Sequence, residues 1–530
     1  LVVEWRNGSI QTFSDIKANQ LLVIKQSSDT TPNHKSATTK KPILYTRSES
    51  FNKIIHSESS FDDFKLQPLL PNKQSTRGPT MEWADIDGDN DSDLFIGGSA
   101  NKPGRLFRND NGNLNEIESK SLNNSKQSED VNSLWFDADS DSDLDLIVIS
   151  GSNEFPAADK RYADRLYLND GSGNLSISTS FPAPAISTNA ICKVDINNDG
   201  SPDLITAGSA RVGQYPEPNE SYCMINSGSG KFSLRPVPAM NSAGLINDLI
   251  SVDIDKDGSA EIIAACEWGP IRIYKINNGT IEEQTSAWNL SNHTGWWNSL
   301  SAADLDNDGD IDIVATNYGL NTKYKANKEK PELLYYSDFD QSGAPDIVEA
   351  KFEGDLIVPR RGFSCSQLAM PFLKDKLKTF HNFASSNLET IYTPSQLAQS
   401  KKYEVNTLEH TVLMNNNGRF ESIKLPREAQ IAPSFGTEIL DVDDDGILDV
   451  ILAHNFFSPQ RETGRMDGGL SLVLKGNGDC TFSALPHSHT GISVSGDTRK
   501  VKAIDLNGNG IKEITFAQNN GPLIIYSKNR

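Results

Sequence analysis

The chain has 530 residues, a formal net charge of −21 and 36% hydrophobic residues. With 38 Gly, 25 Pro and 8% aromatic residues, the composition is typical of a turn-rich β protein and not of a helical bundle or a disordered chain. The acidic balance, without a basic stripe, excludes a nucleic-acid partner, and the lack of about eighteen consecutive apolar residues excludes a membrane span.

The opening of the chain precedes the main pattern. It starts with Leu1-Val2-Val3, without an initiator Met or a signal peptide, so we expect a piece cut from a longer precursor. Residues 27–49, which are rich in Ser, Thr, Lys and Pro, are interpreted as a linker between a first segment, residues 1–26, and a domain over residues 50–530.

One acidic pattern, D-x-[DN]-x-[DNS]-x-x-x-[DE], recurs along most of the chain, and internal repeats of this kind indicate a repeat architecture. It occurs as DIDGDNDSD from Asp85, DADSDSDLD from Asp137, DINNDGSPD from Asp195, DIDKDGSAE from Asp253, DLDNDGDID from Asp304, DFDQSGAPD from Asp338, DVDDDGILD from Asp441 and DLNGNGIKE from Asp505. A short β-like run precedes and follows each copy, so each is predicted to be a hairpin turn.

Four β-like runs recur every 51 to 64 residues, which is typical of a propeller blade. The predicted fold is all-β, a seven-bladed β-propeller. The Asp338 copy breaks the spacing and is interpreted as an elaborated turn between strands three and four of the blade that starts near Trp297. A partly helical insertion is expected at about residues 354–406. Eight blades are the alternative, if the Asp338 hairpin begins its own blade.

The last blade has only three β-like runs before the chain stops. The segment from Phe51 to Ile55, ahead of the first acidic loop, is predicted to supply the fourth strand and close the ring, since closure removes two open sheet edges. Five cysteines, Cys192, Cys223, Cys266, Cys365 and Cys480, lie far apart without a CxxC pair and are predicted to pack in the core.

Oxygen ligands at alternating positions of a tight loop suit Ca²⁺, whereas the absence of His and Cys disfavours Zn²⁺. Several Ca²⁺ ions, up to eight, are therefore expected. Positions 1, 3, 5 and 9 would offer side chains and position 7 a backbone carbonyl. The predicted ligands are Asp85, Asp87, Asp89, Asp91 and Asp93; Asp137, Asp139, Asp141, Asp143 and Asp145; Asp195, Asn197, Asp199, Ser201 and Asp203; Asp253, Asp255, Asp257, Ser259 and Glu261; Asp304, Asp306, Asp308, Asp310 and Asp312; Asp338, Asp340, Ser342, Ala344 and Asp346; Asp441, Asp443, Asp445, Ile447 and Asp449; and Asp505, Asn507, Asn509, Ile511 and Glu513.

The acidic hairpins with their trailing apolar strands resemble the FG-GAP/VCBS repeats of integrin-α-type propellers. The opening, with Val3, Trp5, Gly8 and Ala18-Asn19-Gln20, resembles the end of an ASPIC/UnbV module. Together they suggest the family related to cartilage acidic protein. That resemblance implies a secreted or cell-surface location, Ca²⁺ binding and adhesion, and it carries over no catalytic set.

The face opposite the acidic turns carries long loops with aromatic and Arg side chains, which favour ligand binding. The candidate ligand-binding residues are Tyr215, Trp296, Trp297, Tyr318, Phe456 and Arg461. Packing between blades is an equal interpretation of Trp296 and Trp297. The predicted function is a non-enzymatic binding or adhesion module for an extracellular protein or glycan.

The alternative is a polysaccharide lyase or hydrolase on that face, with His293, His454, Tyr318 and Arg461 as candidate groups. No GxSxG or HExxH motif supports it.

Overall fold

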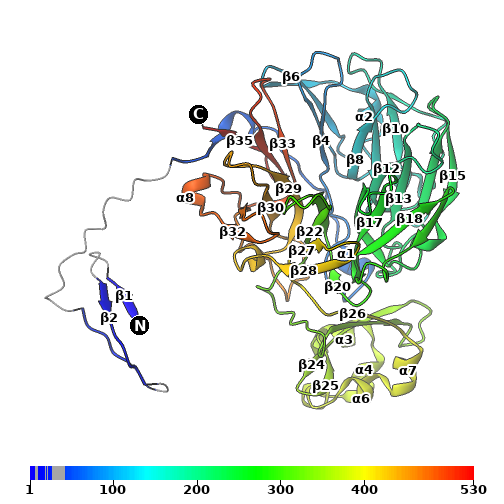
Figure 1. Cartoon of the computed structure of the whole chain (residues 1–530). Helices are drawn as coiled ribbons and strands as arrows, with labels where there is room; N and C mark the ends of the chain where they lie inside the picture. The colour runs from blue at the N-terminus through cyan, green and yellow to red at the C-terminus, as the bar shows by residue number, and fades with distance from the viewer. Residues whose placement is uncertain (6–9, 18–19, 21, 27–41, 530) are drawn as a thin grey trace.

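The computed structural model describes residues 1–5, 10–17, 20, 22–26 and 42–529. Most of the described chain forms four-stranded antiparallel sheets, consistent with the blades of a propeller (Figure 1). In chain order, the first four are β4 (Met81–Ala84), β5 (Asp93–Ile96), β6 (Arg105–Asp110) and β7 (Asn113–Ile117); β8 (Asp130–Phe136), β9 (Asp145–Ser150), β10 (Arg165–Leu168) and β11 (Ser176–Ile177); β12 (Thr188–Val194), β13 (Asp203–Gly208), β14 (Tyr222–Asn226) and β15 (Phe232–Pro236); and β16 (Leu245–Val252), β17 (Glu261–Pro270), β18 (Arg272–Asn277) and β19 (Thr280–Glu283), with β20 (Thr294–Trp296) paired to β17.

Three further sheets continue the series, and two of them join segments that are distant in sequence. They are β21 (Ser299–Ala303), β22 (Asp312–Thr316), β27 (Thr411–Asn415) and β28 (Phe420–Lys424); β29 (Ser434–Leu440), β30 (Asp449–His454), β31 (Leu472–Gly476) and β32 (Phe482–Ala484); and β33 (Asp497–Ile504), β34 (Glu513–Asn519), β35 (Ile524–Lys528) and β3 (Tyr45–Ser48). The short helices outside these sheets are α1 (Asp63–Leu66), α2 (Lys120–Asn124), α8 (His487–Thr490) and the 3-10 turns η1 (Glu49–Phe51), η2 (Lys160–Tyr162), η3 (Pro238–Met240) and η4 (Ala429–Ile431).

The seven sheets pack face to face in a closed series. Each successive pair shares one buried apolar cluster, and the last pair, sheets seven and one, shares the cluster that contains Ile504, Ile525, Met81 and Leu94. Because neighbouring sheets cover both faces of each sheet, the second strands consist mainly of apolar residues. For example, β9 is buried along its whole length. Cys192, Cys223, Cys266 and Cys480 lie in these clusters, as predicted, whereas Cys365 is half-buried.

An N-terminal strand supplies the last sheet, but its position differs from the prediction. β3 pairs with β35, with Tyr45 opposite Lys528 and Ser48 opposite Ile525. The segment from Phe51 to Ile55 forms no strand there: Phe51 and Ile54 pack into the closing cluster, and Ile55 makes only an isolated antiparallel bridge with Pro522. Closure therefore begins at Tyr45, within the stretch that the sequence analysis assigned to a linker, of which residues 27–41 lie outside the described residues.

The Asp338 hairpin lies in a separate sheet that is inserted between strands two and three of the fifth sheet, not between strands three and four. Its order is β25-β24-β23-β26, and five short helices cover it (Figure 1). The insertion thus begins well before residue 354. Its elements are β23 (Glu332–Ser337), β24 (Asp346–Glu353), β25 (Leu356–Pro359), β26 (Lys401–Val405), α3 (Phe363–Ala369), α4 (Phe372–Leu377), α5 (Phe380–Ala384), α6 (Leu388–Tyr392) and α7 (Pro394–Gln399).

Near the N-terminus, β1 (Val2–Glu4) pairs with β2 (Ile10–Thr12) in a two-stranded hairpin. Three of the residues that resemble an ASPIC/UnbV module, Gly8, Ala18 and Asn19, lie outside the described residues. None of the helices in the described part of the chain has the length and apolar character that a membrane crossing requires.

Candidate metal centres in the acidic loops

Each acidic loop closes on its own first aspartate. In all eight copies the carboxylate at position 1 accepts a hydrogen bond from the backbone N–H of position 6, at 2.7 to 3.0 Å between nitrogen and oxygen. The backbone at positions 4 and 6 has positive φ in every copy. Glycine tolerates this conformation without strain, and it occupies position 6 in all loops except the first two, which have Asn90 and Ser142.

The acid at position 9 joins the loop to the sheet. In all eight copies it accepts the backbone N–H of position 2, at 2.8 to 3.0 Å. In five copies its second oxygen also accepts a backbone N–H at the end of strand three, as Asp93 does from Asn109 at 2.7 Å. An acid fixed at position 9 therefore has a structural role without any metal, which the sequence analysis did not foresee.

Four asparagines at the end of strand three connect neighbouring sheets. Their side-chain amides donate to the carbonyl oxygen of position 2 in the loop of the preceding sheet, for example Asn169 to Ile86 at 2.8 Å; the others are Asn109 to Leu506, Asn226 to Ala138 and Asn415 to Ile254. Sequence reasoning missed these residues. The signal was present, because each asparagine stands just before the Gly-containing turn that follows strand three.

The loops bring carboxylates close together and leave some of their oxygens without partners. Ligand atoms within 4.8 Å of one another come from Asp85, Asp87 and Asp93, from Asp137, Asp139 and Asp145, and from Asp253, Asp255 and Glu261. Buried oxygens without a hydrogen-bond partner belong to Asp87, Asp139, Asp253, Glu261, Asp304 and Asp443. Because a buried carboxylate oxygen without a donor is costly, these clusters are consistent with Ca²⁺ sites, and the oxygen-only donor set fits that ion.

Burial also affects the protonation of the position-9 acids. It raises the pKa of Asp93, Asp145 and Asp449 to about 6, and that of Asp346 to about 7. Backbone N–H groups that donate to the first three lower the pKa in part. A cation bound among the acids would oppose the effect of burial, since it favours the ionised form.

Three loops receive a basic side chain from strand three of their own sheet. Lys275 lies 2.5 Å from Asp255 and 2.6 Å from Asp257, Lys475 contacts Asp443 and Asp445, and Arg108 lies 2.7 Å from Asp87. In sheets two, three and five the register puts an apolar residue at the position that these basic residues occupy. These apolar residues are Leu168, Ile225 and Met414. The loops thus share one backbone geometry but differ in the charge beside them.

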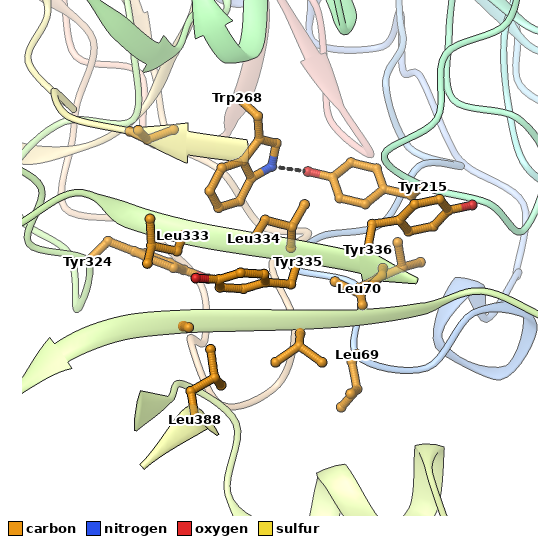
Figure 2. Close-up of a cluster of buried hydrophobic side chains, with 14 of the residues drawn as sticks. Leu69, Leu70, Tyr215, Trp268, Tyr324, Leu333, Leu334, Tyr335, Tyr336 and Leu388 are labelled. Atoms are coloured by element: carbon orange, nitrogen blue, oxygen red, sulfur yellow. Dashed lines mark hydrogen bonds between the residues drawn. The ribbon is translucent and has the colours of Figure 1, made fainter. Parts of the chain in front are cut away.

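The candidate ligand-binding aromatics on the opposite face are buried. Tyr215, Trp296, Trp297, Tyr318 and Phe456 are each less than 5% exposed, and only Arg461 is exposed. All but Trp297 lie in the cluster where the inserted sheet packs against the ring (Figure 2). There Trp268 donates to the Tyr215 hydroxyl at 2.6 Å, above the strand that carries Leu333 to Tyr336. Trp297 lies in the cluster between sheets four and five, so packing between sheets describes it.

The residues considered for catalysis lie in different settings. His454 is fully buried, Tyr318 is 4% exposed, and Arg461 lies on the surface. Within the described residues, no hydrogen bond or ion pair joins any two of His293, His454, Tyr318 and Arg461.

The fold and loops define a repeat protein of four-stranded sheets with acidic hairpin turns. Comparison with known families agrees: residues 85–148, 137–206, 195–264 and 253–315 match the FG-GAP-like repeat. The chain therefore carries FG-GAP-like repeats, and the hydrogen-bond pattern of the loops extends the same geometry to the copies at Asp441 and Asp505. No curated protein sequence matches the chain.

The comparison with solved structures finds matches of low identity. The V. cholerae biofilm matrix protein Bap1 is 12% identical, with 92% of this chain and 91% of that chain covered and a TM-score of 0.40. BBS1N, solved in complex with ARL6DN and soaked with lead, is 9% identical, with 92% of this chain and 98% of that chain covered and a TM-score of 0.42.

Proposed function

We propose that the chain is a seven-bladed, calcium-binding β-propeller that acts outside the cytoplasm as a binding or adhesion module for protein or glycan ligands, and not as an enzyme. The observation that carries this proposal is the repeated acidic loop, in which backbone bonds hold positions 1, 5 and 9 while buried oxygens such as Asp139 Oδ1 and Asp304 Oδ1 lack a donor. A turn needs no such oxygens, whereas a bound cation does.

The acidic loops also support a location outside the cytoplasm. Solvent-exposed acidic loops of this kind bind Ca²⁺ in the range of extracellular modules, roughly 10⁻⁴ to 10⁻³ M, so a compartment with millimolar Ca²⁺ would load them and the cytosol would not. Calcium would hold together carboxylates that otherwise repel, and the charge of −21 would be largely offset.

Thermal unfolding tests the calcium proposal. The full chain should melt at a clearly higher temperature in millimolar Ca²⁺ than in EDTA, and Mg²⁺ at the same concentration should restore less of the difference, because Mg²⁺ demands a stricter octahedral site. Equilibrium dialysis should count several bound ions. Equal melting temperatures in EDTA and Ca²⁺ would contradict the proposal.

Ligand binding and polysaccharide cleavage test the adhesion role and the non-enzymatic assignment. A glycan and matrix-protein array probed in Ca²⁺ and in EDTA should show calcium-dependent binding. Acidic polysaccharides incubated with the chain should stay intact under both conditions. Any specific cleavage would contradict the non-enzymatic assignment and favour the lyase or hydrolase alternative.

A further inference from the structure

Five inner strands carry the same irregularity at the same level. The pairing between strands one and two shifts by one residue near the start of β8, β12, β16, β29 and β33. The extra residue in each strand is, in order, Val131, Asn189, Asn247, Phe435 and Arg499. A bulge of this type bends the strand and re-aims a side chain, and bulges concentrate at the rims of barrels and beside functional sites.

All five extra residues line one cavity of about 80 Å³. The two remaining sheets reach it through the segments before their first strands, with Arg77 ahead of β4 and Asn298 ahead of β21. The cavity is therefore central to the ring. It lies at the start of the inner strands, whereas the acidic loops follow their ends, so the two kinds of site occupy opposite mouths of the ring.

The acidic side chains in the cavity wall are already satisfied. Asp248 accepts the backbone N–H groups of Leu249 and Leu300, at 3.0 and 2.9 Å. Glu267 accepts the hydroxyl of Tyr215 and lies 3.8 Å from Arg77. Neither carboxylate therefore needs a further donor.

The donors in the same wall are not all satisfied. The Nε atoms of Arg77 and Arg499 and the indole Nε1 of Trp296 are buried without a hydrogen-bond partner. Both guanidinium groups are held in place: Arg77 donates to Asn247 at 2.8 Å, and Arg499 donates to Asp497 at 3.0 Å and lies 4.5 Å from the ring of Phe435. The wall thus presents two fixed guanidinium groups and an indole N–H whose remaining hydrogens can be donated to an acceptor.

We propose that this cavity binds a small hydroxylated carboxylate of the uronic-acid type. The guanidinium groups of Arg77 and Arg499 would take the carboxylate, because planar guanidinium donors match that group. The amides of Asn189 and Asn247 would serve the hydroxyls. The inference rests on the proposed binding function but not on calcium.

Titration of the full chain in Ca²⁺ tests the site, by calorimetry and by tryptophan fluorescence. The probes are glucuronate and galacturonate, with glucose as the neutral analogue and acetate and sulfate as simple oxyanions. Both uronates should bind saturably, and glucose, acetate and sulfate at least about tenfold more weakly, because each lacks either the charge or the hydroxyls. Glucose or sulfate that binds as tightly as glucuronate would overturn the ligand assignment, as would the absence of saturable uronate binding.

Variants locate the site. Arg77→Gln should weaken uronate binding about tenfold or more, since a charge-assisted bond is lost. Asn247→Ala should weaken it less. The matched control is Arg105→Gln, which removes an arginine paired with Glu116 at 2.6 Å outside the cavity and should leave binding unchanged. Uronate binding that Arg77→Gln leaves intact in a folded chain would place the ligand elsewhere. Calcium-dependent melting, measured in parallel, would show separately whether the calcium proposal stands.

Discussion

The acidic loops of sheets four and six differ from those of sheets two, three and five in one strand-three residue. Lys275 and Lys475 reach into the first pair, while Leu168, Ile225 and Met414 stand at that position in the others. In all five loops the N–H of position 6 donates to the acid at position 1, and the N–H of position 2 donates to the acid at position 9. Backbone geometry is thus independent of the neighbouring charge.

The strand-three residue beside a loop should therefore change calcium affinity without changing the backbone fold of the loop. A lysine ammonium among carboxylates offsets their repulsion as a cation would, so a loop with lysine should lose less stability without calcium. The same ammonium competes for the oxygens that calcium needs. We therefore expect the loops of sheets two and three to hold the ion more tightly, and the loops with lysine to depend on it less. The loop of sheet five belongs with the latter, since Lys256 of the preceding loop lies 2.7 Å from its Asp310.

Both kinds of loop belong to one closed ring of sheets, so we expect the largest loss of stability when that ring is opened. Deletion of residues 1–48 removes β3, including the buried Tyr45, and exposes the edge of β35. We expect loss of cooperative unfolding or a drop of more than about 3 kcal/mol in unfolding free energy. Deletion of residues 1–41 is the control and should be tolerated. Melting and proteolysis in Ca²⁺ compare the two; equal stability would mean that closure does not depend on β3.

The next largest loss of stability should follow replacement of the aspartate at position 1 of a loop. Asp304→Ala removes the acceptor of the Gly309 N–H from a loop with four acids at positions 1, 3, 5 and 9, and Asp505→Ala does the same for Gly510 in a loop with two. At a calcium concentration of 100 times Kd, a lost site costs about 2.7 kcal/mol, and the lost hydrogen bond about 1 kcal/mol more. Asp304→Ala should approach that sum and Asp505→Ala about half of it. Denaturant melts that reverse the order would show that acid count does not govern these sites.

The pH should change the calcium effect. Burial raises the pKa of Asp93 and Asp145 to about 6, above the ordinary value near 4, so without metal the folded state holds their protons more tightly than the unfolded state. In EDTA, the stability from these groups is therefore present below about pH 4 and lost as the pH rises through 6. Calcium requires the ionised form, so its gain in melting temperature should be larger at pH 7.5 than at pH 5. A calcium gain that does not change with pH would contradict this.

Replacing the lysine tests the comparison directly. Lys475→Met introduces the residue that sheet five carries as Met414. In EDTA it should destabilise the chain by about 0.2–1 kcal/mol, because the contacts with Asp443 and Asp445 are lost from a part-exposed site. In Ca²⁺ the site should bind more tightly. Lys424→Met, which removes a surface pair with Glu409, is the control and should leave calcium affinity unchanged.

The sequence predicted the features that recur in it. The acidic turns, the strands around them and a closing strand near the N-terminus follow from local pattern. The position of that strand did not, because the stretches at Tyr45 and at Phe51 are both β-like, and only the ring decides which one pairs. The Asp338 hairpin was assigned to the fifth sheet because it repeats the same local signal within a different tertiary setting.

The sequence did not predict the cavity and the buried aromatic residues at the opposite mouth of the ring, for a physical reason. A bulge is a shift of one residue between partners, and residues such as Asn189 and Arg499 carry no local mark of it. The aromatic residues Tyr215 and Tyr318 stand in loops, and they are buried in the cluster where the inserted sheet packs against the ring. Exposure inferred from loop position fails where another part of the chain covers the loop.

The smallest expected effect concerns the two loops without glycine at position 6. Ser142 has a φ of 77°, a conformation that costs a non-glycine residue about 1–2 kcal/mol, while glycine loses about 0.5–1 kcal/mol through its freer unfolded chain. Ser142→Gly should therefore stabilise the chain by about 0.5 kcal/mol, in EDTA and Ca²⁺ alike, because the strain belongs to the backbone and not to the ion. Ser259→Gly, at position 7 of another loop, where φ is not positive, is the matched control and should give no gain. A gain for Ser142→Gly in Ca²⁺ alone would mean that the ion, and not the turn, imposes this conformation.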